Sequence, residues 1–179
     1  MAMQRISGEG NEAEQRFLQR WPAATKPAHS KDGDWSIVVD NQAVCVEVKQ
    51  CAAPPGTAGT INQIRAIKYT PMLVYNPALQ VWLVVPAAEL VRRAAQKQRG
   101  QHTEISFESM NLSFRELAEF QCAEDDLVEA VTAAVRFDRA HRILSVAMVA
   151  LHAQIRSVAD NAIHEARRLT ATVAVFRLR

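Results

Sequence analysis

Asp34, Glu47 and Lys49 carry the side chains of this sequence that could do chemistry together. Carboxylates supply the oxygen ligands that Mg²⁺ prefers, and this ion usually binds through one or two of them together with waters and a substrate phosphate. An amine beside such an ion can orient an attacking water and offset the charge that builds on a phosphorus atom under attack. These residue types together favour hydrolysis of a phosphodiester.

A predicted β-hairpin brings the three residues together. The runs 35–39 and 44–49 alternate in polarity, and an Asp-Asn pair between them has the chemistry of a tight turn. Because side chains two apart share a face of a strand, Glu47 and Lys49 point the same way, while the intervening valines enter a core. A solvated strand face is the alternative interpretation of this pair. Asp34 favours a metal site over a solvated strand face. It stands at the start of the first predicted strand, opposite the end of the second, so that two carboxylates converge.

The motif resembles that of the PD-(D/E)xK nuclease superfamily, which has the restriction-endonuclease-like fold. Asp34 is followed after twelve residues by Glu47-Val48-Lys49, and Gly33 stands where the family name has proline. The resemblance covers roughly residues 5 to 120. It implies that Asp34, Glu47 and the backbone carbonyl of Val48 hold Mg²⁺, for which Mn²⁺ substitutes, and that Lys49 positions the attacking water.

The same resemblance nominates two further catalytic residues. The run from Gly10 to Leu18 is similar to the first helix of the archaeal Holliday-junction resolvases, where a glycine precedes an active-site glutamate by four residues, and this points to Glu14. The run 62–64 resembles the place where many members carry a glutamine near the metal, and this points to Gln63. We expect Glu14 to act on the ion through water, and Gln63 to orient Lys49 or the attacking water.

A basic segment gives the predicted site a nucleic-acid partner. Residues 92–102 include no acidic side chain, and such a cluster binds phosphates with salt-sensitive affinity that does not depend on sequence. The net charge is only +2, so DNA contact must come from a local patch. A solvated helix face is the alternative for each residue taken singly. The DNA-binding candidates are Arg65, Lys68, Arg92, Arg93, Lys97 and Arg99.

The order of predicted elements favours an α/β fold. We expect helices near 10–21, 60–69 and 87–98, with buried strands at 72–75 and 81–85 beside the hairpin. Together they would form the mixed β-sheet of the restriction-endonuclease-like fold, flanked by helices. The uncharged run 69–88 contains three prolines, so we assign it to the core of the protein and not to a membrane helix.

Residues 1–122 form the predicted nuclease-like core, and residues 123–179 form a helical C-terminal extension. From Cys122 to Arg168 there is no proline or glycine, and apolar residues recur at helical spacing. One apolar series steps by three and four residues like a coiled-coil seam and suggests a homodimer, with packing on its own domain as the alternative. The β-branched run 171–178 suggests a short final strand. The series is Leu144, Met148, Leu151, Ile155, Val158, Ala162 and Leu169.

These patterns predict a metal-dependent endodeoxyribonuclease, and the resemblance of the first helix to the junction resolvases implies structured DNA, such as Holliday junctions or flaps, as its substrate. A sequence-specific enzyme of the type II restriction class is the first alternative. A non-catalytic DNA-binding or assembly module on the same fold is the alternative from another class. The three cysteines lack CxxC spacing and the N-terminus is polar, so we expect a cytoplasmic protein with no small-molecule cofactor.

Overall fold

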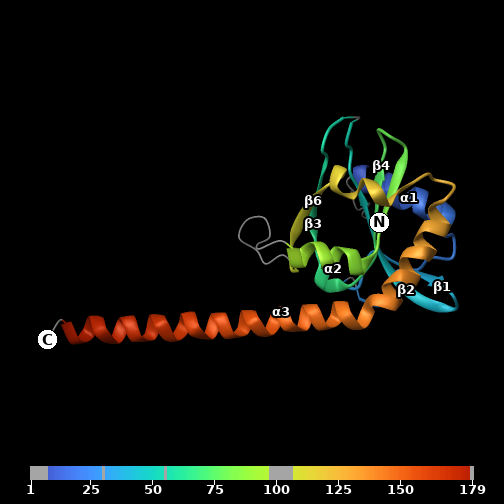
Figure 1. Ribbon diagram of the computed structural model, residues 1–179. Coiled ribbons are helices and arrows are strands. Elements are labelled where there is room, and N and C mark those ends of the chain that lie inside the picture. Colours follow the sequence, from blue (N-terminus) through green and yellow to red (C-terminus); the bar gives the residue numbers. More distant parts are fainter. Residues whose placement is uncertain (1–7, 30, 55, 97–106, 178–179) are drawn as a thin grey trace, which may run out of the picture. The chain divides into compact units, whose positions relative to one another are not determined.

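The computed structural model describes residues 8–29, 31–54, 56–96 and 107–177, with the side chains of 12–168 described inside these ranges. The chain divides into two compact units, Met1–Arg142 and Ile143–Arg179. Figure 1 shows the elements, coloured in chain order. The elements are α1 (Gly8–Arg20), β1 (Trp35–Val39), β2 (Gln42–Gln50), β3 (Thr60–Ile64), η1 (Ala66–Lys68), β4 (Met72–Asn76), β5 (Val81–Val85), α2 (Ala87–Gln96), β6 (Met110–Ser113), η3 (Arg115–Phe120), β7 (Gln121–Cys122) and α3 (Leu127–Arg177).

A mixed five-stranded β-sheet forms the centre of the first unit. Its strand order is β1-β2-β4-β5-β7, and a separate two-stranded sheet pairs β3 with β6. Strands β2 and β4 run parallel, whereas the other neighbouring pairs are antiparallel. The predicted α/β class, with a mixed sheet, flanking helices and a helical C-terminal extension, is confirmed.

The predicted hairpin is also confirmed, and its turn explains why it forms. Asp40 and Asn41 both have positive φ, 50° and 61°, which is the backbone that a two-residue hairpin turn with the right twist requires. Aspartate and asparagine tolerate this region better than most residues do. The register runs from Val39 opposite Gln42 to Trp35 opposite Val46.

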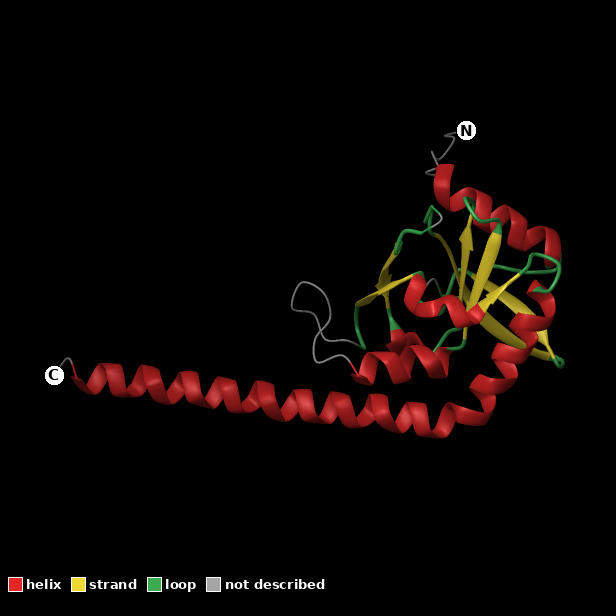
Figure 2. Ribbon diagram, turned by 45° about the horizontal axis from the view of Figure 1, so that its top comes forward, coloured by secondary structure: helices red, strands yellow, loops and turns green. Residues whose placement is uncertain are grey.

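Helix α1 and the first turns of α3 cover one face of the sheet, as Figure 2 shows. Phe17 packs there with Val46 and Val48 of β2, and Leu127 and Val131 of α3 belong to the same buried cluster. The compact unit accordingly runs past the start of α3 to Arg142. Side chains that alternate with this cluster, among them Glu47 and Lys49, lie on the opposite face of the sheet.

Two of the expected elements are wrong. The expected helix over 60–69 is strand β3 followed by the short helix η1, because residues 60–64 pair with β6, which comes much later in the chain. The expected strand over 171–178 is also wrong, since α3 continues to Arg177. The residues of each segment are compatible with either a helix or a strand. Segment 60–64 became a strand because β6 pairs with it, and segment 171–177 stayed helical as the continuation of α3.

In the second unit α3 exposes a series of apolar side chains. Leu144, Leu151, Ile155 and Val158 are between 58% and 69% exposed in the single chain. They belong to the series predicted to form a coiled-coil seam. The part of α3 from Leu127 to Arg168 is also long and apolar enough to cross a membrane, by length and composition only, and the mean hydropathy over an 18-residue window of it is 1.2.

Candidate active site

Asp34 directly precedes β1, beside the edge of β2 where that strand extends beyond its pairing with β1. Its backbone N–H donates to the Val46 carbonyl at 2.9 Å, and its carboxylate Oδ2 accepts the Val48 N–H at 2.8 Å. Since the N–H and C=O of one strand residue face the same side, the Val48 carbonyl also faces this edge. Asp34 and Val48, two of the predicted metal ligands, therefore meet at one place.

Glu47 and Lys49 lie side by side on the face of β2 opposite the α1 core. Their Oε1 and Nζ atoms are 3.3 Å apart, and their side chains are 20% and 24% exposed. Lys68 of η1 donates from Nζ to the other oxygen of Glu47, Oε2, at 2.9 Å. Lys68 was predicted to contact DNA, and the structure gives it this carboxylate as its partner. Glu47 is therefore held between two lysines.

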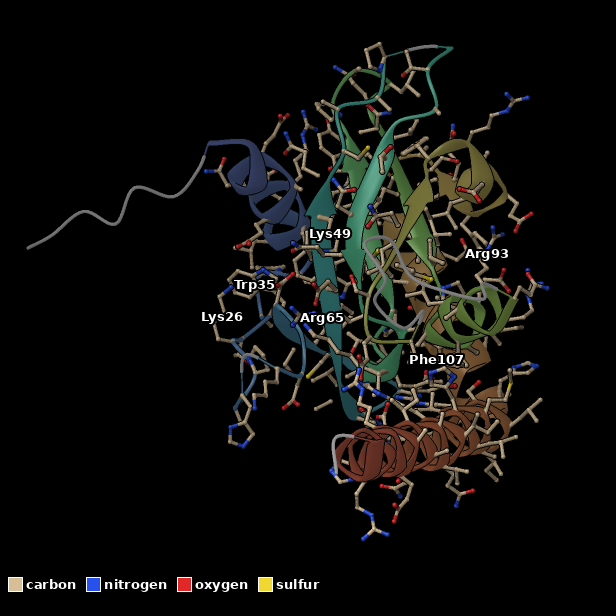
Figure 3. All side chains as sticks on the ribbon, turned by 90° about the vertical axis from the view of Figure 1, so that its left-hand side faces the viewer. Lys26, Trp35, Lys49, Arg65, Arg93 and Phe107 are labelled. Carbon is tan, nitrogen blue, oxygen red and sulfur yellow. The ribbon has the colours of Figure 1, made fainter. Side chains whose placement is uncertain are left out.

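Lys26 is a third cation near the site, and it was not predicted from the sequence. Its ammonium donates to the Asp34 carbonyl at 3.2 Å and lies 3.7 Å from the carboxylate of Glu14. The same group stacks on the Trp35 ring at 3.5 Å, and Figure 3 shows the two side chains together. No motif marks Lys26 in the sequence, because it belongs to an irregular loop before β1. Through Lys26, Glu14 is brought to the Asp34 end of the site.

The pKa values of the two central carboxylates, Asp34 and Glu47, are shifted in opposite directions. Burial raises the pKa of Asp34, the nearby charges of Glu47 and Glu14 raise it further, and the Val48 hydrogen bond and Lys49 act against them. Burial also acts to raise the pKa of Glu47, but the hydrogen bond from Lys68 and the charge of Lys49 outweigh it, so that this pKa is lowered. The negative charges of Glu47 and Glu14 repel that of Asp34, and a divalent cation bound among these carboxylates would relieve the repulsion.

The donors at this edge suit Mg²⁺ better than a transition metal. The free oxygen of Asp34, the carboxylate of Glu47 and the Val48 carbonyl are all hard oxygen ligands, of the kind that Mg²⁺ takes together with waters and a phosphate. Among the described residues, no group of three or more His, Cys, Asp or Glu side chains is placed to hold a metal. A closed site such as structural zinc occupies is therefore not formed by the described part of the chain.

The backbone N–H of Gln63 does not contact any of the other nominated residues, and the pairing of its strand is irregular at this point. It has a φ of +55° at an irregularity in the β3 pairing, and its backbone N–H donates to Asn111 at 3.0 Å. A small cavity of about 10 Å³ beside Glu47 and Lys49 is lined from this segment by Ile64, and Gln63 does not line it. The helix that was expected to position Gln63 does not exist.

The two described arginines of the predicted basic segment, both on α2, are paired with carboxylates. Arg92 and Arg93 both bind the carboxylate of Glu89, each through Nε at 2.7 Å, and Arg93 also pairs with Glu119. Figure 3 shows Arg93 on α2, well apart from Lys49 and Arg65. Lys97 and Arg99 lie outside the described residues. Arg65 is exposed and lines the small cavity beside Glu47 and Lys49.

We expect Gly33→Ala to destabilise the protein by about 2 kcal/mol, because Gly33 adopts a backbone that other residues avoid. Its φ is +154°, and an added Cβ would lie 2.9 Å from the Val46 carbonyl oxygen. Proline, which fixes φ near −65°, fits even less, although the family motif has it there. Chemical denaturation measures the change. Gly56→Ala is the matched control: Gly56 also has a positive φ, +79°, but a Cβ there meets nothing within 4 Å, so its loss should be smaller. Equal losses at the two positions would contradict the close approach at Gly33.

No protein-family model matches the sequence, and no curated protein matches it at a significant level. Among solved structures, the chain is similar to the bacterial homing endonuclease I-Ssp6803I. The two share 14% sequence identity with a TM-score of 0.41, over 62% of this chain and 78% of the other.

Proposed function

We propose that this protein is a Mg²⁺-dependent endonuclease that hydrolyses phosphodiester bonds in DNA. One observation carries the proposal: the Asp34 carboxylate is fixed by the Val48 N–H at the open edge of β2, next to the Glu47 and Lys49 pair. Metal ligands and an amine in this arrangement are what hydrolysis of a phosphodiester requires. Structured DNA such as a junction or flap is the substrate class we favour.

Each residue has a role that follows from its position. Asp34, Glu47 and the Val48 carbonyl would hold Mg²⁺, which supplies a Lewis acid for the phosphate and lowers the pKa of a bound water. Lys49 orients the attacking water and offers its charge to the phosphorane-like transition state. Lys68 keeps Glu47 ionised, and Glu14 acts on the site through water. The Asp34 carboxylate must be deprotonated to bind the ion, so protons would compete with Mg²⁺ at this side chain, whose pKa burial raises in the metal-free protein.

A cut through both strands of a duplex or junction needs two such sites. The exposed apolar series on α3, which includes Leu151, Ile155 and Val158, is the surface through which we expect two chains to pair. Molar mass in solution, recorded with the cleavage assay, reports on this pairing.

The test is a Mg²⁺ titration of cleavage on a panel of linear duplex, flap and four-way junction substrates. We expect cutting that EDTA abolishes, that Mn²⁺ also supports and that is fastest on the junction or flap. The Asp34→Asn variant, purified in parallel, controls for contaminating nucleases. Rapid cutting of one linear sequence would favour the restriction-type alternative. DNA binding without metal-dependent cutting of any substrate would contradict the proposal and favour the non-catalytic module.

A metal-binding readout that does not depend on turnover accompanies the assay. Mg²⁺ should raise the thermal midpoint of the parent protein, because an ion that binds only the folded state stabilises it. The Asp34→Asn variant should lose most of this increase. An equal rise in parent and variant would show that the ion binds elsewhere.

A further inference from the structure

A pocket of about 280 Å³ lies next to the candidate active site, inside the first unit. Lys68 and Thr70 line both this pocket and the small cavity beside Glu47 and Lys49, so the two spaces adjoin. The other walls come from β2 and from α3. The catalytic residues proposed above, Asp34, Glu47 and Lys49, do not line the larger pocket.

The lining of the pocket includes several cationic side chains. Three cations line it: Lys68, Arg139 and Arg142. Arg139 is anchored, since it donates to the Val39 carbonyl at 2.9 Å and to the Asp40 carboxylate at 3.1 Å. Arg142 is exposed, and no ion pair or hydrogen bond engages its guanidinium in the described structure. One cation is therefore held in place and another is available to a ligand.

Two carboxylates also line the pocket, and they differ in what they present to a ligand. Asp138 turns both of its oxygens to the N–H groups of Ala87 and Ala88, at 2.8 Å each. Asp32 is exposed and lines the pocket, so its negative charge faces any ligand bound there. Asp32 thus opposes an anion in the pocket, and its removal should strengthen binding.

We propose that this pocket binds a backbone phosphate of the nucleic-acid strand, next to the phosphate held at Glu47 and Lys49. This inference rests on the proposed function. The strand would run from Arg65, past Lys49 and Lys68, to Arg142, and not along α2, whose arginines are paired with Glu89 and Glu119. Arginine suits such a contact because its planar donor set matches phosphate oxygens.

The test is DNA binding by fluorescence anisotropy in Ca²⁺, across a range of salt concentrations. Loss of one phosphate contact should weaken binding about five- to tenfold near 0.1 M salt and lower the salt-dependence slope by about one. We expect this result for Arg142→Ala, with Arg142→Lys restoring most of the affinity. Asp32→Asn should strengthen binding severalfold, a change in a direction that misfolding cannot mimic. The matched control is Arg115→Ala, an exposed arginine of η3 that lines neither space.

The outcomes separate this inference from the proposed function. If Arg142→Ala and Asp32→Asn bind like the parent, the pocket assignment is wrong, whether or not the protein cuts DNA. If both variants shift affinity as expected while no substrate is cut, the pocket stands and the nuclease proposal fails. In a cleaving enzyme, Arg142→Ala should raise KM and leave kcat within about twofold, because its contact is equal in the ground and transition states.

Discussion

Asp34→Asn and Lys49→Ala should each lower kcat for DNA cleavage by about 10³-fold, which is about 4 kcal/mol of transition-state stabilisation. The asparagine variant would keep the size of the side chain and lose the charge that attracts a divalent ion. The alanine variant would lack the amine that lies 3.3 Å from Glu47 and would leave the backbone of β2 in place. Single-turnover cleavage with saturating enzyme measures the chemical step directly.

Matched substitutions show that these losses are specific. Asp125→Asn removes an aspartate that is 91% exposed, and Arg115→Ala removes an exposed cation, and both should cut DNA at the parent rate. Lys68→Ala provides a sharper comparison. Lys68 donates to Glu47 Oε2 and would compete with a metal for that oxygen, so its loss should lower the Mg²⁺ concentration for half-maximal activity while kcat falls by less than about tenfold. If Lys49→Ala retains the parent rate and Lys68→Ala does not, the roles of the two lysines have been assigned the wrong way round.

The hairpin was predictable because its information is local. Asp40 and Asn41 specify the turn, and the alternation on each side specifies which residues face the core. Once the turn is known, the register places Asp34 opposite the Glu47 end of β2. A close pair of Glu47 and Lys49 follows from their spacing alone.

The remaining contacts of the site depend on distant parts of the chain. Lys68 reaches Glu47 only because the segment 60–68 is a strand and a short helix, and that strand depends on β6 for its partner. Lys26 reaches Glu14 from a loop without regular structure. No local pattern encodes either contact, so the sequence predicted neither the Lys68–Glu47 pair nor the place of Lys26.

The ion pairs of Arg92 and Arg93 had a local signal. Glu89 precedes these residues by three and four positions on the same helix, a spacing at which opposite charges pair. Residues 92–102 contain no acidic side chain, but the segment begins after Glu89, so the carboxylate that pairs with the two arginines lies outside it. Basic clusters on a helix are better judged together with the acidic residues one turn before them.

Asp138 is a buried carboxylate outside the candidate active site, and we expect its ionisation to change the stability of the protein measurably. It lies on α3 and accepts the first N–H groups of α2, so it caps that helix from a distant part of the chain. Burial raises the pKa of Asp138 to about 6, against the effect of these two hydrogen bonds. Since the side chain is almost fully buried, screening by solvent is small.

The sign of the resulting pH dependence follows from proton linkage. Between the unfolded pKa of 3.8 and the folded pKa of about 6, the native state binds more protons at Asp138 than the unfolded state does. The contribution of Asp138 to stability is therefore largest below the lower pKa and is lost as the pH rises through the higher one. The full span is about 3 kcal/mol, of which about 2 kcal/mol falls between about pH 4.5 and pH 7.

The measurement compares the parent with Asp138→Asn by urea unfolding across that pH range. The asparagine side chain cannot ionise and can cap with one oxygen only, so the variant should carry a constant penalty and lack the pH-dependent contribution. The free energy of unfolding of the parent minus that of the variant should fall by about 2 kcal/mol from about pH 4.5 to pH 7. Other carboxylates titrate alike in both proteins and cancel in this difference. A difference that stays flat, or rises with pH, would mean that the Asp138 pKa is not raised, and that the two N–H groups of α2 outweigh its burial.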